Sequence, residues 1–226
     1  MPILFEVTQA WKSAFPGAHA GVLVMRAVNN PASHAELERA KEDLMGDLRA
    51  SYGRLERSQL LALPALQVYD EYYKRFKKTY HVQLQLESIV FKGKSIPSVA
   101  ALVEAMFMAE IKNMLLTAGH DLDALESPIR LDVTRGDEIY TLMRGQPQQV
   151  KPGDMIISDN LGIMSNIIYG PDQRTQIQPG TRKVLYTIYA PAGIAEADIT
   201  RHLQDIEGYV RMFSAEARTD LLHVFG

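Results

Sequence analysis

The sequence contains no cysteine. That absence excludes a disulfide framework, a zinc site built on thiolates and a cysteine nucleophile. It suits a reducing compartment, so we expect a cytosolic protein. The N-terminal residues also lack the basic start and the apolar stretch of a secretory signal, which agrees with that expectation.

A long uninterrupted apolar run is missing as well. The most apolar segment, residues 99–116, contains Glu104, Glu110, Lys112 and Asn113. A bilayer would have to bury those polar groups at high cost. The segment therefore predicts a helix in the core of a globular protein, and we expect no membrane partner.

An excess of positive charge is also absent. The net charge is −3 and the pI is near 6.1, whereas dedicated nucleic-acid binders usually carry a basic footprint. The hydrophobic fraction of 46% over 226 residues is typical of one large domain, or of one domain with an extension.

Residues 1–80 predict an α/β portion. The apolar run 20–28 predicts a buried strand, and a helix follows it, with Ser33 as its cap and Glu36 completing a capping box. Gly53 is suited to end that helix. Its apolar stripe consists of Leu37, Ala40, Leu44 and Leu48.

A second helix is predicted from Pro64, since proline is tolerated at a first helical position. One face of it carries large apolar side chains, namely Leu66, Tyr69, Tyr73, Phe76 and Tyr80. Basic side chains lie on or beside the opposite face, namely Lys74, Arg75, Lys77 and Lys78. Two interpretations remain open for them: the solvated side of a core helix, or a surface that contacts the phosphates of RNA.

The segment 93–191 predicts a sheet-rich unit with the helix 98–116 buried against it. Turns rich in Gly, Pro and Asp separate short strand-like segments, which is typical of an antiparallel sheet system. These segments are 129–134, 139–143, 155–158, 163–169 and 183–189. An amphipathic helix with Ile199 and Phe213 on its apolar face, then a short helical tail, complete the prediction.

The fold class is therefore α+β. We divide the chain into residues 1–80, an N-terminal α/β portion packed on the main domain, residues 81–193, the sheet-rich domain, and residues 194–226, a C-terminal helical segment.

General catalytic signatures are missing. The sequence has no glycine-rich phosphate loop, no Gly-x-Ser-x-Gly elbow and no His-Glu-x-x-His helix, so we predict no metal and no cofactor. We interpret most of the histidines as surface or capping groups, namely His19, His34, His81, His202 and His223.

The exception is Gly119-His120-Asp121, directly after the apolar helix. One interpretation makes Gly119 the left-handed helix stop and Asp121 a cap for the next element. The other makes these residues a polar wall of a pocket. A second polar cluster contains Asp172, Arg174 and Thr175; Asp172 and Arg174 either pair within a turn or meet a ligand's amine and its carboxylate or phosphate.

The order of these features resembles the editing domain of the phenylalanyl-tRNA synthetase beta chain, called B3/B4, in its stand-alone bacterial form. The resemblance covers residues 80–193, about half of the chain. It rests on Gly93-Lys94-Ser95-Ile96-Pro97, Leu102-Val103-Glu104, His120-Asp121, Gly153-Asp154, Ile157-Ser158-Asp159, the turn from Asp172 to Thr175 and Val184-Leu185-Tyr186-Thr187.

The resemblance implies a pocket for a misattached aromatic amino acid and hydrolysis of its ester to tRNA, which is double-sieve editing. It implies that His120 orients the ester or water. Thr187 stands where the family has a glutamate that reads the tyrosine hydroxyl, and Phe107 where it often has asparagine, so we expect a less polar pocket on which these three side chains converge.

The remaining substrate-binding residues implied are Gly119, Asp121, Asp172, Arg174 and Thr175, with Asp172 and Arg174 lining the mouth. Two functions remain open. The first is aminoacyl-tRNA recognition with hydrolysis of a mischarged ester; the second is a non-catalytic module that binds an amino acid or an RNA end. A third, a structural or interaction protein, has no specific feature in its favour.

Overall fold

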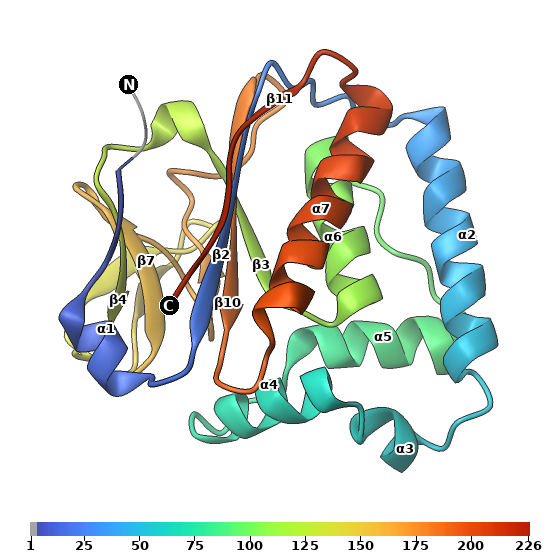
Figure 1. Ribbon diagram of the computed structural model, residues 1–226, viewed down its shortest axis with the longest axis horizontal. Coiled ribbons are helices and arrows are strands. Elements are labelled where there is room, and N and C mark those ends of the chain that lie inside the picture. Colours follow the sequence, from blue (N-terminus) through green and yellow to red (C-terminus); the bar gives the residue numbers. More distant parts are fainter. Residues whose placement is uncertain (1–3) are drawn as a thin grey trace.

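The computed structural model describes residues 4–226 and has the predicted α+β class (Figure 1). Its helices are α1 (Gln9–Ala14), α2 (Ala35–Tyr52), α3 (Arg57–Leu61), α4 (Pro64–Lys74), α5 (His81–Lys92), α6 (Ala101–Asn113), the 3-10 turn η1 (Leu122–Ala124) and α7 (Glu196–Phe213). Its strands are β1 (Phe5–Val7), β2 (His19–Arg26), β3 (Thr117–Asp121), β4 (Ile129–Val133), β5 (Ile139–Thr141), β6 (Pro147–Gln149), β7 (Met155–Asp159), β8 (Gly162–Asn166), β9 (Gly170–Pro171), β10 (Lys183–Ala190) and β11 (Arg218–Phe225).

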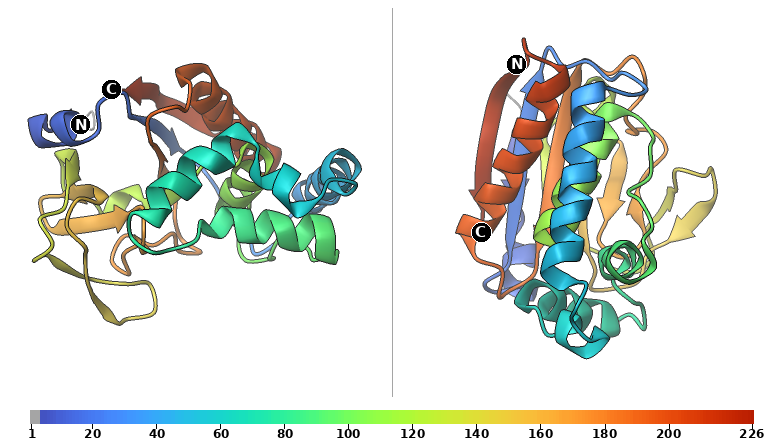
Figure 2. Two further views of the ribbon diagram at one scale, coloured as in Figure 1. Left: turned by 90° about the horizontal axis from the view of Figure 1, so that it is seen from below. Right: turned by 90° about the vertical axis from the view of Figure 1, so that its right-hand side faces the viewer.

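These strands form a five-stranded sheet in the order β1-β4-β7-β8-β9 and a four-stranded sheet in the order β11-β2-β10-β3. The four-stranded sheet is the central layer, with the five-stranded sheet on one side and α6 and α7 on the other (Figure 1). The hairpin β5-β6 stands out from the body (Figure 2). β2 and β10 are buried on both faces, which explains why their sequences are almost continuously apolar.

Alternation along β10 separates two environments. The Tyr186 hydroxyl donates to the carbonyl of Leu102 in α6, so this residue faces the helices. The Tyr189 hydroxyl bonds to Ser165 in β8, so Thr187 and Tyr189 face the five-stranded sheet. α7 comes close to the central sheet at Gly21, where an added Cβ would lie 2.5 Å from Cγ2 of Ile199.

The predicted apolar faces are confirmed. Leu37, Leu44 and Leu48 of α2 are buried, as are the five large residues of the α4 region, although Phe76 and Tyr80 lie beyond the end of α4. α6 is buried against the sheet over most of its length, as expected. Within residues 4–226, no helix is both long enough and apolar enough to cross a membrane.

Three local predictions are wrong. α2 begins after His34 and Ser33 does not cap it. The apolar helix ends at Asn113 with Met114 in the left-handed conformation, so Gly119 is not its stop and lies inside a strand. The predicted helical tail is β11, because residues 218–225 pair with β2 along the edge of the central sheet. α5 is an element that the sequence did not predict.

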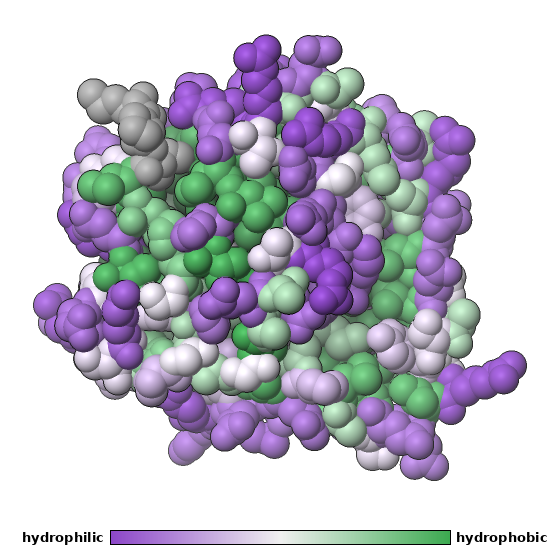
Figure 3. Space-filling view, viewed as in Figure 1, coloured by the Kyte–Doolittle hydropathy of each residue, from purple (hydrophilic) through white to green (hydrophobic). Residues whose placement is uncertain are grey.

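The three predicted segments share the sheets. β2 from residues 1–80, β10 from residues 81–193 and β11 from residues 194–226 are neighbours in the four-stranded sheet, and β1 pairs with β4. The strands β1 and β11 are also in contact, since the rings of Phe5 and Phe225 stack with centroids 4.5 Å apart. Figure 3 shows hydrophobic residues gathered on the face of the molecule that carries these two strands.

Candidate functional site

A cavity of about 360 Å³ opens beside the edge strand β3. Its walls come from α6, β3, the start of α5 and the segment around β9. Most lining side chains are apolar, including Met106, Phe107, Met143, Ile167 and Ile177. A mostly apolar cavity with a few polar groups is the usual form of a small-molecule site.

The free edge of β3 supplies backbone groups to this cavity. The Tyr189 N–H donates to the Leu116 carbonyl, which shows which residues of β3 exchange backbone hydrogen bonds with β10. In an antiparallel pair, alternate residues point their N–H groups toward the partner strand, so residues 117, 119 and 121 direct theirs away from β10. Thr117 and Asp121 do so, since their N–H groups bond to the Glu110 side chain and the Thr175 carbonyl. The N–H of Gly119 therefore points away from β10, past the edge of the sheet, and Gly119 lines the cavity.

Gly119 is a glycine for reasons of space. A Cβ there would lie 2.9 Å from Cδ1 of Ile177, 3.2 Å from the Tyr186 ring and 3.3 Å from the sulfur of Met106. A side chain would therefore enter the space that the cavity and its wall occupy.

A buried carboxyl group, that of Glu110, lines the cavity. It lies in the last turn of α6, and its Oε1 accepts the Thr117 N–H at 2.7 Å. Burial raises the pKa of Glu110 to about 8 although that hydrogen bond acts in the opposite direction. Glu110 is therefore mostly protonated at neutral pH and can donate a hydrogen bond to a ligand.

An unpartnered amide is the second polar group. Asn166 is 1% exposed and lines the cavity. Its Oδ1 accepts the Tyr169 N–H at 2.7 Å, which fixes the orientation of the amide. Among the described residues its Nδ2 has no partner. A buried donor without a partner costs free energy, so the site is suited to a ligand oxygen.

The third polar group is His81, the first residue of α5. It lines the cavity while keeping contact with solvent, and the surrounding protein atoms lower its pKa. Its Nδ1 lies 3.4 Å from the hydroxyl of Tyr73.

His120 and Thr187 do not line the cavity, so the predicted convergence with Phe107 is wrong for both. They are completely buried on the face of β3 and β10 that packs against the five-stranded sheet. Strand alternation sends neighbouring side chains to opposite faces, so Tyr186 faces the helices instead. The Thr187 hydroxyl has no partner there among the described residues. Phe107 and Gly119 are the two predicted residues that do line the cavity.

His120 belongs to a buried hydrogen-bonded chain. Its Nδ1 lies 2.7 Å from Oγ1 of Thr175, and its Nε2 lies 3.4 Å from Oγ of Ser165. The Thr175 hydroxyl donates to Asp172, so Nδ1 of His120 carries the proton. Burial lowers the pKa of His120 to about 3, which keeps the ring neutral. These contacts hold β3, β8 and the turn after β9 together.

The other predicted polar residues also have protein partners. Arg174 binds Asp159 through two nitrogens, at 2.8 and 2.9 Å, and lies 3.5 Å from Asp172. Asp121 caps η1 by accepting the Asp123 N–H, as expected, and its Oδ2 accepts the Thr181 hydroxyl.

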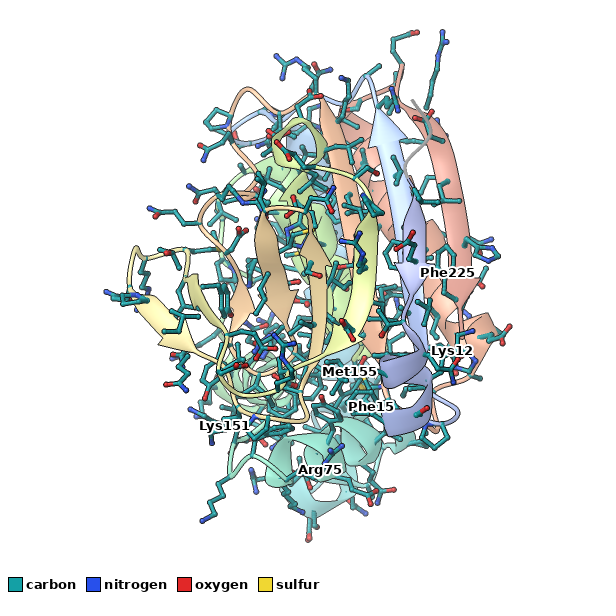
Figure 4. All side chains as sticks on the ribbon, turned by 90° about the vertical axis from the view of Figure 1, so that its left-hand side faces the viewer. Lys12, Phe15, Arg75, Lys151, Met155 and Phe225 are labelled. Carbon is teal, nitrogen blue, oxygen red and sulfur yellow. The ribbon has the colours of Figure 1, made fainter. Side chains whose placement is uncertain are left out.

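The four basic residues near α4 divide into two groups. Lys74 pairs with Asp70. The Arg75 guanidinium lies within 6 Å of three aromatic rings, those of Phe15, Tyr72 and Phe76. Figure 4 shows Arg75 and Phe15 next to each other. Lys77 and Lys78 are exposed.

Lys78 is connected to the cavity. Its Nζ lies 5.5 Å from the ring centroid of Tyr169, and Tyr169 lines the cavity. This lysine therefore places a positive charge near the cavity wall.

Sequence reasoning missed Glu110, Asn166 and His81 as site residues. Glu110 had a signal, since a carboxylate in an otherwise apolar helix needs a reason to be buried. His81 and Asn166 had none, because only the pairing of β8 and β9 and the position of α5 bring them to β3.

No protein-family model matches the chain, and no curated protein matches its sequence. Among solved structures, it is similar to an N-terminal fragment of the phenylalanyl-tRNA synthetase beta subunit from Pyrococcus horikoshii, with a TM-score of 0.52 and 8% sequence identity. The alignment covers 100% of this chain and 55% of that fragment. The similarity concerns the fold.

Proposed function

We propose that the cavity beside β3 binds the aminoacyl end of an aminoacyl-tRNA and that the chain acts in editing. The observation that carries this proposal is the cavity itself, mostly apolar and about 360 Å³, in a chain whose fold is similar to a synthetase beta-subunit fragment. The resemblance of residues 80–193 to the B3/B4 domain agrees with it. An aromatic or large aliphatic side chain fits such a lining.

In the family a glutamate binds the hydroxyl of the tyrosine side chain, and this chain has Thr187 at the corresponding position. Glu110 provides the carboxyl group that binds a ligand hydroxyl here. Its protonated carboxyl can donate to a ligand hydroxyl or, when ionised, accept from one. A buried group that satisfies a substrate hydroxyl discriminates against the analogue without it far better than apolar contact does.

The nucleotide end has room outside the cavity. Phe107 also borders a neighbouring groove of about 290 Å³ between α5 and residues 94–97, so one ring lies between the two hollows. Aromatic rings stack on bases, and Lys78 and Lys94 supply positive charge for phosphates.

The test is a panel of mischarged tRNAs incubated with the purified chain, with release of amino acid and binding of a non-hydrolysable analogue both measured. We expect binding, weakened at least tenfold by Phe107→Ala and unchanged by Phe91→Ala, an exposed ring of α5 outside the cavity. Equal binding by both variants would place the ligand elsewhere.

A non-catalytic binding module is the second candidate. The observation in its favour is the burial of His120, because the resemblance assigns to this residue the orientation of ester or water and no substrate can reach it. Binding of the analogue without release of any amino acid from the panel would favour this candidate.

A further inference from the structure

Within residues 4–226, two hydrogen-bond donors that have no protein partner border the same cavity. Nδ2 of Asn166 is buried and unpartnered among the described residues, and the N–H of Gly119 points out of the free edge of β3. β9 connects them in space, since it pairs with β8, which carries Asn166, and packs against β3. Neutral hydrogen-bond donors that face a common ligand oxygen are the arrangement that stabilises the oxyanion of acyl transfer.

A basic nitrogen borders the cavity as well. The Tyr73 hydroxyl donates its proton to the Ile167 carbonyl at 2.7 Å, so its 3.4 Å contact with His81 requires Nδ1 of His81 to be the donor. That tautomer leaves Nε2 with a free lone pair. Among the described residues no side chain or carbonyl is bonded to Nε2, and the ring remains open to solvent, the source of water.

We propose that His81 is the general base of an ester hydrolysis in this cavity, and that Asn166 and Gly119 bind the carbonyl oxygen of the ester. The choice of an aminoacyl ester as substrate rests on the proposed function; the assignment of the three residues does not.

In the step, Nε2 of His81 removes a proton from water while the water oxygen attacks the carbonyl carbon. The carbonyl oxygen becomes the oxyanion and accepts hydrogen bonds from Asn166 Nδ2 and the Gly119 N–H. The bond from carbon to the ribose oxygen then breaks, and the imidazolium returns its proton to that oxygen. The products are a free ribose hydroxyl and a carboxylic acid, which loses its proton to solvent.

Asn166→Asp is the sharpest variant, because the new carboxylate keeps an oxygen for the Tyr169 N–H and removes the donor. His81→Gln removes the base from an exposed position, where folding is not at risk. The control is His223→Gln, on the exposed strand β11 away from the cavity. Two probes are used, a mischarged tyrosyl-tRNA and the methyl ester of tyrosine, with binding of the non-hydrolysable tRNA analogue measured alongside.

We expect turnover of the tRNA ester to fall at least a hundredfold in Asn166→Asp and in His81→Gln, with analogue binding by His81→Gln and turnover by His223→Gln unchanged. Binding of the analogue by the parent chain without hydrolysis of either ester overturns this inference and leaves the proposed function standing. If the parent neither binds nor cleaves the tRNA ester, the proposed function fails. In that case, a hundredfold fall in turnover of the methyl ester in Asn166→Asp and His81→Gln supports the assignment of the three residues. If the parent chain does not hydrolyse the methyl ester, that assignment is overturned.

Discussion

At the residue scale, Glu110 shows how burial converts an ordinary side chain into an unusual one. Its carboxyl accepts one hydrogen bond, from Thr117, and has no cation beside it among the described residues, so the neutral form is favoured. His120 and His202 are the counterpart, because burial lowers the pKa of each to about 3 and holds both rings neutral.

We predict that Glu110 makes the fold less stable as the pH rises. Between the ordinary pKa of 4.5 and the folded value of about 8, the unfolded chain loses the proton that the folded chain keeps. Stability is therefore fully present below pH 4.5 and falls by up to ~1.4 kcal/mol per pH unit above it. Glu110→Gln, whose amide oxygen can still accept from Thr117, should remove this loss.

The measurement is urea unfolding at pH 5, 6.5 and 8 for the parent chain, Glu110→Gln and the control Glu42→Gln, an exposed residue of α2. The advantage of Glu110→Gln over the parent should grow with pH. A constant difference across the three pH values would mean that the carboxyl ionises normally in the folded chain.

At the scale of the element, the close packing of α7 on the central sheet depends on a glycine in β2. Gly21 lets Ile199 of α7 approach the backbone of β2, and an added Cβ would meet it at 2.5 Å. α2 is joined to α6 differently, through the buried Lys41, whose Nζ lies 2.8 Å from Glu104 and 2.9 Å from Glu38.

We predict opposite effects for two glycine substitutions. Gly21→Ala should destabilise the chain by about 1–3 kcal/mol, because the packed helix has to shift. Gly208→Ala should stabilise it by about 0.5–1 kcal/mol, since this glycine lies within α7 with nothing within 4 Å of the added methyl. Urea midpoints measure both, and a neutral Gly21→Ala would contradict the tight contact between α7 and β2.

The helices and strand β11 show which elements local sequence patterns predict and which they do not. The apolar periods of α2, α4 and α7 predicted their buried faces, since a helix repeats every 3.6 residues whatever surrounds it. β11 was predicted as helix because its strand state depends on pairing with β2, which lies almost the whole chain length away.

At the scale of the whole molecule, positive and negative charges nearly cancel, so any attraction for an anionic partner has to be local. The chain carries a net charge of −3, and two of the four lysines and arginines near α4 are engaged with Asp70 or with aromatic rings. Lys77 and Lys78 are the remaining pair, and Lys78 reaches the ring of Tyr169 at the cavity.

We predict that Lys77→Gln and Lys78→Gln together weaken tRNA binding and flatten its salt dependence, by about 0.7–0.9 in the log–log slope for each phosphate that the variant no longer neutralises. Lys74→Gln should change neither by more than a small amount, because its charge is paired with Asp70. Binding titrations at a series of salt concentrations test this. A slope unaffected by the double substitution moves the RNA surface away from the cavity mouth.

The sequence by itself determined which segments are buried and which turn, because those preferences come from local periodicity and from Gly, Pro and Asp chemistry. The family resemblance also predicted Phe107 and Gly119 as pocket residues, and both line the cavity. The tertiary structure decided the rest of the site. The phase of β3 against β10 sends Gly119 to the cavity and His120 into the layer between the sheets, a difference of one residue that no local pattern encodes. The same long-range pairing leaves Nδ2 of Asn166 without a partner among the described residues, since hydrogen-bond satisfaction depends on which strands meet.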